Sequence, residues 1–137
     1  MNKFRAEIVL NDCRLALEKF DEQLIDDEFR LNLVLNLALL RAVGHCLNDE
    51  LGSKDTHYVN KKEDRIYKEF ICDFRNKILK NYKACVSWEV SSNIDSDTSK
   101  VNYLITDGSY KDKDVRHVIA EAIVWWEIYI AELKKIL

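Results

Sequence analysis

The sequence predicts one mainly helical domain over residues 1–137, a bundle of four to five helices with a small two-stranded β-hairpin before the last helix. The chain has no proline and only three glycines, so few residues interrupt long helices. Its apolar residues recur mostly at helical spacing, and only residues 86–105 change to alternation. Hydrophobic residues make up 47% and charged residues 33%, a balance typical of a soluble globular domain long enough to bury a core.

The first helix is expected over about residues 3–20. The acidic segment DEQLIDDE follows at residues 21–28, and it predicts a turn or a helix start because carboxylates favour helix N-termini. The residues expected to be buried in the first helix include Phe4, Ile8, Leu15 and Leu17.

A central helix is expected to follow and to end near Leu51, with Gly52 as its C-cap. Between residues 31 and 47, 12 of 17 residues are apolar and surround the helix, so it should be buried on most sides. The segment is too short and too polar for a membrane span. At about 100° per residue, Arg30, Arg41 and His45 share one narrow stripe, which needs a partner or water.

The third helix is expected over about residues 61–83, after a loop. This segment has eight basic and four acidic residues, a balance of +4, whereas the whole chain is −3 and the remainder therefore −7. A basic face on an acidic protein attracts phosphates locally. Its expected core residues are Tyr67, Phe70, Ile71, Phe74, Ile78 and Cys85. On the opposite and flanking surface lie Lys61, Lys62, Arg65, Lys68, Arg75, Asn76, Lys80 and Lys83.

Two short antiparallel strands are expected next, because apolar residues alternate with polar ones on both sides of a mobile loop at about residues 92–100. Asp107 and Gly108 predict a turn, and Asp112 or Asp114 is expected to cap the last helix. The alternating apolar residues are Val86, Trp88, Val90, Val101, Tyr103 and Ile105.

The last helix carries apolar residues on two sides. Val124 and Ile128 lie opposite its main stripe, and either a second subunit or the β-hairpin is expected to cover them. The core stripe is expected to contain Val118, Ala122, Trp126, Tyr129 and Leu133.

Metal and redox chemistry is not expected. The cysteines form no CxxC pair and sit among apolar residues, where reduced cysteine packs as a small hydrophobe. The three histidines lack neighbours at metal-ligand spacing, so no metal site and no cofactor is predicted. The N-terminal segment lacks the features of a signal peptide, which predicts a cytoplasmic protein without a membrane partner.

The stretch FRNKILKNY at residues 74–82 resembles the signature of the HEPN (higher eukaryotes and prokaryotes nucleotide-binding) superfamily. In that signature a helical Arg, often followed by Asn, precedes a His by four to six residues, and some members have a Tyr two residues later. Arg75, Asn76 and Tyr82 match, and Lys80 stands in the position of the His. The stretches RAVGH, YLITDG and WW also resemble small bacterial HEPN-like proteins, and the likeness covers about residues 29–126.

The resemblance implies a compact helical homodimer whose two motifs meet in a shared cleft. Active HEPN proteins are metal-independent endoribonucleases of toxin–antitoxin, abortive-infection or CRISPR systems. In them the 2′-hydroxyl of the RNA attacks the adjacent phosphate, while Arg stabilises charge and His handles protons. The implied catalytic set here is Arg75, Asn76, Lys80 and Tyr82.

Lysine in place of the motif histidine favours binding over cleavage. A histidine has an ordinary pKa of about 6.5, whereas a lysine, at about 10.4, is a poor base at neutral pH. Lys80 is therefore expected to contact phosphate as a point charge, and Tyr82 to hold a phosphate oxygen or to border the core. Arg41 and His45, four residues apart on one helix face, are secondary candidates. The expected nucleic-acid-binding set is Arg65, Lys68, Arg75, Lys80 and Lys83.

Three functions follow from these residues. The first is a HEPN-like homodimer of a bacterial toxin–antitoxin or defence system that binds RNA or a nucleotide with weak or no catalysis. The second is an active metal-independent endoribonuclease toxin. The third is an antitoxin or immunity-type protein that binds and inhibits a cognate protein, because the −7 balance outside the third helix suits an acidic surface that masks a basic nuclease.

Overall fold

The computed structural model describes residues 4–20, 26–52, 64–81, 86–93 and 98–136. The described chain is mainly helical, with a two-stranded antiparallel hairpin before the last helix, which confirms the predicted fold class. Its elements are α1 (Arg5–Phe20), α2 (Asp26–Leu51), the π-helix η2 (Ile66–Phe74), α4 (Arg75–Asn81), β1 (Val86–Asn93), β2 (Thr98–Ile105) and α5 (Val115–Ile136).

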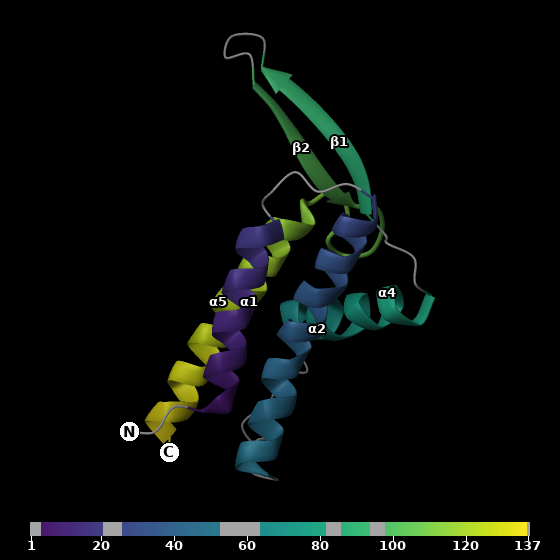
Figure 1. Ribbon diagram of the computed structural model, residues 1–137. Helices are drawn as coiled ribbons and strands as arrows, with labels where there is room; N and C mark the ends of the chain where they lie inside the picture. Colours follow the sequence, from purple (N-terminus) through teal and green to yellow (C-terminus); the bar gives the residue numbers. More distant parts are fainter. Residues whose placement is uncertain (1–3, 21–25, 53–63, 82–85, 94–97, 137) are drawn as a thin grey trace.

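Helices α1, α2 and α5 lie alongside one another, and η2 with α4 crosses them at a steep angle (Figure 1). The hairpin projects from the end of the bundle where α5 begins, while the start of α1 and the end of α5 lie together at the other end (Figure 1). Helix α1 runs antiparallel to α2, because Arg5 pairs with Asp49 and the Ala16 carbonyl accepts a hydrogen bond from Asn36.

Of the four residues that were expected to be buried in the first helix, Phe4 and Leu17 are partly buried against the core and the other two are not. The buried residues Ala6, Leu10 and Cys13 of α1 follow one helical stripe, whereas Ile8 and Leu15 are exposed. The expectation for Ile8 and Leu15 was therefore wrong, because positions two or five residues from a buried residue turn away from that stripe at about 100° per residue.

Helix α2 supplies a long row of buried leucines, but Leu31 and Leu35 are exposed. One face of this helix is thus open, whereas every other residue between 31 and 47 except His45 is buried or half-buried, as expected of a helix buried on most sides. By length and composition alone Asp27–Leu51 could also cross a membrane, a test that core helices of soluble proteins pass as well. Gly52 ends α2 as predicted, with a φ of 61° and an N–H that donates to the Asn48 carbonyl.

The third helix begins as a π-helix, in which i→i+5 hydrogen bonds widen each turn by about one residue. The N–H of Arg75 donates to the carbonyls of Phe70 and Cys72, and the chain continues from there as α4. Phe70, Ile71, Phe74 and Ile78 are buried as predicted, whereas Cys85 lies outside the described residues.

The hairpin is longer than expected. Val86 pairs with Ile105 and Asn93 with Thr98, so the strands extend into the segment at residues 92–100 that was predicted to be a loop. Tyr103 and Ile105 are fully buried at the base of the hairpin. Gly108, with a φ of 84°, forms the predicted turn.

Asp114 caps α5 by accepting a hydrogen bond from the Arg116 N–H at 2.9 Å, which resolves the choice between Asp112 and Asp114. The predicted core stripe of α5 is confirmed, because all five of its residues are buried. Val124 and Ile128 are half exposed, so the described part of the hairpin does not cover them.

Candidate functional site

Helix α4 starts with the motif arginine. The Arg75 Nη1 donates to the Asn76 side-chain oxygen at 2.8 Å, so these two motif residues act together. The Nε of Arg75 is buried and has no hydrogen-bond partner among the described residues. A buried donor that lacks an acceptor costs free energy.

Helix α2, which packs against α4, presents Arg41. The Arg41 Nη1 donates to the Tyr67 hydroxyl at 3.0 Å, and its guanidinium carbon lies 5.8 Å from the centre of the Tyr67 ring. Tyr67 in turn stacks on Trp125 at 5.3 Å between ring centres. Gly44 leaves room for this arrangement, because a Cβ there would lie 3.0 Å from the Arg41 Nη1. Arg41 is therefore held in place by η2 and by its own helix.

His45 lies one turn beyond Arg41 on α2 and is exposed. Partial burial, the Arg41 guanidinium and the Arg75 guanidinium together hold the pKa of His45 below its ordinary value of 6.5. Arg75 acts on His45 electrostatically from α4, and α4 packs against α2, so the charges of two guanidinium groups reach one imidazole. We call these three residues the Arg41–His45–Arg75 cluster.

The other predicted site residues are less concentrated. Lys80 is exposed in the last turn of α4, and Lys68 is exposed on η2. Tyr82 and Lys83 lie outside the described residues, so their predicted roles stay predictions.

Arg65 belongs to a different neighbourhood. Its Nε pairs with Glu69 at 3.2 Å, its Nη2 donates to the Ser109 carbonyl, and its guanidinium carbon lies 4.6 Å from the centre of the Tyr110 ring. Arg65 thus supports the turn before α5, whereas Arg75 donates to Asn76 on its own helix.

His45, Asn76 and Lys80 of this site are exposed side chains. Two hollows in the described structure, of about 450 Å³ between α1 and α5 and about 200 Å³ beside Phe74 and Tyr110, have other linings. An open basic surface suits a ligand that is a chain of phosphates better than a small enclosed molecule. Among the described residues, no group of three histidine, cysteine or acidic side chains is placed to hold a metal ion.

The lowered pKa of His45 gives a direct test of the cluster. We expect a titration of the His45 imidazole, followed by NMR, to give a pKa below 6.5, and Arg75→Ala to raise it. Because the folded-state pKa lies below the unfolded one, the unfolded chain binds more protons and stability falls as the pH drops below about 6.5. Arg65→Ala is the matched control and should leave the pKa unchanged. A pKa of His45 that is the same in Arg75→Ala would show that the two side chains are not neighbours in solution.

No family model matches the sequence, and no curated protein or solved structure matches it.

Proposed function

We propose that the Arg41–His45–Arg75 cluster, with Asn76 and Lys80 along α4, binds the phosphate groups of RNA or of a nucleotide. The observation that carries this proposal is that the packed helices α2 and α4 carry two arginines whose positive charges both act on one exposed imidazole. A guanidinium presents a planar fork of donors that matches phosphate oxygens, and an exposed lysine adds a point charge.

The residue types of the motif favour RNA binding without strong RNA cleavage. Lys80 takes the position that the motif histidine holds in the HEPN resemblance, and a lysine is a poor proton shuttle at neutral pH. We therefore place the protein among HEPN-like binding proteins, in the toxin–antitoxin or defence setting that the resemblance implies.

The test is the affinity for a fluorescently labelled single-stranded RNA, measured by anisotropy at two salt concentrations. Arg75→Ala should weaken binding by about 10- to 100-fold, because hydrogen bonds to charged groups contribute about 1.5–3 kcal/mol. Lys19→Ala, which removes one exposed charge from α1, is the control and should change the affinity much less. Equal affinities of Arg75→Ala and Lys19→Ala would refute the site, as would a wild-type affinity that does not depend on salt.

A second function, metal-independent RNA cleavage, is favoured by one observation. His45 carries an imidazole within electrostatic reach of Arg75, and its pKa is lowered by partial burial and by Arg41 and Arg75, which favours the neutral form that can accept a proton. Cleavage of the same RNA in EDTA that disappears in both Arg75→Ala and His45→Ala would establish this activity. RNA that is bound and stays intact would support binding alone.

A further inference from the structure

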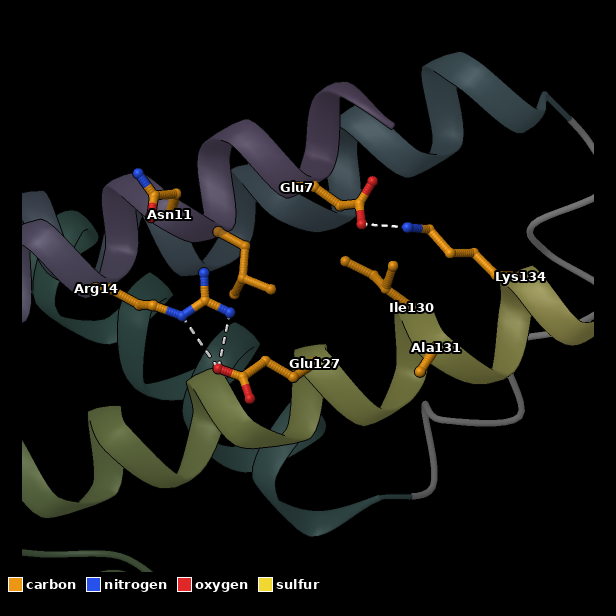
Figure 2. Close-up of a pocket in the computed structure, with 8 residues that line it drawn as sticks. Glu7, Asn11, Arg14, Glu127, Ile130, Ala131 and Lys134 are labelled. Atoms are coloured by element: carbon orange, nitrogen blue, oxygen red, sulfur yellow. Dashed lines mark hydrogen bonds and ion pairs between the residues drawn. The ribbon is translucent and has the colours of Figure 1, made fainter. Parts of the chain in front are cut away.

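The outer face of the α1–α5 layer contains a groove of about 450 Å³ (Figure 2). Ile130 points into its middle (Figure 2), and Leu10 also lines it. One end is closed by Arg14 and Glu127, whose Nη2 and Oε1 are 2.8 Å apart, and the other end by Glu7 and Lys134. The two ion pairs join α1 to α5 across the groove and fix the helices antiparallel.

The four charged residues alternate in sign around this groove. On α1 an acid and a base lie seven residues apart, at Glu7 and Arg14, and on α5 the same spacing separates Glu127 from Lys134. Seven residues make about two turns, so each pair faces one side of its helix. Because the helices are antiparallel, each of these four side chains has the opposite charge from its neighbour on the same helix. It also has the opposite charge from its neighbour across the groove.

Exposed apolar side chains flank the groove on both helices. Ile8 and Leu15 lie on the outer side of α1, and Val124 and Ile128 lie opposite the buried stripe of α5. Each of the four is about half exposed or more. Large apolar side chains gathered on one face favour a protein partner over open water.

We propose that this α1–α5 face binds the same face of a second copy of the chain. A two-fold interface brings each patch against its own copy, so a surface must complement itself. With the two-fold axis along the groove, Glu7 meets Lys134 of the partner subunit. With the axis across the groove, Glu7 meets Arg14 of the partner subunit. In both arrangements opposite charges meet. This charge complementarity is the reason to propose a second copy of the chain as the partner.

This inference does not rest on the proposed phosphate site, because the α1–α5 face contains no residue of the Arg41–His45–Arg75 cluster. It also differs from the shared cleft that the HEPN resemblance implies. A dimer formed through the shared cleft would instead use the exposed side of α2. Leu31 and Leu35 lie there, next to the side of α2 that carries Arg41 and His45.

The experiment is the mass of the protein in solution, measured by sedimentation over a range of concentrations. The wild type should reach about twice the 16.1 kDa of one chain. Leu15→Glu should raise the dimer dissociation constant at least about tenfold, because two carboxylates enter an apolar contact. Leu35→Glu on α2 is the matched control: Leu35 is 48% exposed and Leu15 51%, and the substitution is the same. Leu35→Glu should leave the dimer intact.

Two further variants keep the test decisive. Circular dichroism checks that each variant is folded, and Ile128→Glu replaces Leu15→Glu if that variant unfolds. The double swap Arg14→Glu with Glu127→Arg keeps the ion pair within one chain; the dimer should survive it if the axis lies along the groove and weaken if the axis lies across it. A wild type that stays monomeric at all concentrations overturns the proposal. So does a dimer that is lost only in Leu35→Glu, or one that neither Leu15→Glu nor Ile128→Glu weakens.

Discussion

Asp114→Ala is expected to lower the free energy of unfolding by about 3–5 kcal/mol, because it leaves a buried arginine without its charge partner. The Asp114 carboxylate accepts hydrogen bonds from Nε and Nη2 of Arg116 at 3.1 and 3.0 Å, and both residues are buried. It also accepts the Tyr103 N–H at 3.1 Å. One side chain thus caps α5, holds Arg116 and ties the base of the hairpin to the bundle.

The same contacts predict how stability depends on pH. Burial raises the pKa of the Asp114 carboxyl, but the hydrogen bonds from Arg116 and from the Tyr103 N–H outweigh it and leave the pKa below its ordinary value of 3.8. A lowered folded-state pKa contributes stability that is present above the unfolded pKa and is lost as the pH falls below about 4. Asp114→Ala should remove this part of the acid dependence.

Urea unfolding at pH 7 and pH 3 measures both effects. Asp114→Asn and Asp112→Asn form a matched pair, because Asp112 is exposed two residues earlier. Asp112→Asn should change stability by less than about 0.5 kcal/mol, since asparagine also tolerates the φ of 70° at this position. Similar losses in the two variants would contradict a structural role for the buried pair.

A helix whose main apolar stripe clearly outweighs the second one was predictable from the sequence, and a helix with two comparable apolar stripes was not. In α5 the main stripe is larger and more aromatic than Val124 and Ile128, so periodicity identified the buried side. In α1, by contrast, Ile8 and Leu15 are as apolar as Leu10, while small residues such as Ala6 and Cys13 occupy the buried stripe. Periodicity alone cannot choose between two apolar faces, because the neighbours of the helix decide which one is covered.

The third helix shows a second limit. Sorting its residues at about 100° per residue assumes an α-helix throughout, but Ile66–Phe74 forms a π-helix with about one more residue per turn. The core residues were still identified, because they are the apolar ones. The positions of Arg65 and Arg75 relative to each other were not, because the wider turns lie between them. In the structure these two arginines contact different parts of the fold.

The candidate site depends on contacts between residues far apart in the sequence. The sequence placed Arg41 and His45 on one stripe that needs a partner, and it separately singled out Arg75. That Arg75 approaches His45 follows only from the packing of α4 on α2. The role of Tyr67 was missed as well, since an aromatic residue on a core stripe gives no sign that its hydroxyl holds an arginine.

Trp126→Ala is the second large expected effect, a loss of about 3–5 kcal/mol in the free energy of unfolding. The Trp126 ring is almost fully buried, and its Nε1 donates to the Leu40 carbonyl at 2.9 Å, which links α5 to α2. It also meets Tyr67 edge to face at 5.8 Å between ring centres. Alanine would leave a cavity where three helical segments meet.

The comparison with two milder variants separates the cavity from the hydrogen bond. Trp126→Phe keeps most of the ring and loses the N–H donor, so it should cost about 1–2 kcal/mol. Trp125→Ala removes a partly buried indole that donates to exposed Asp64, and its cost should be well below that of Trp126→Ala. Because a Cβ on Gly44 would lie 3.2 Å from the Trp126 ring, that ring also limits how closely α2 approaches α5 beside Arg41. Equal unfolding free energies of Trp126→Ala and Trp125→Ala would mean that the α2–α5 contact is not the centre of the core.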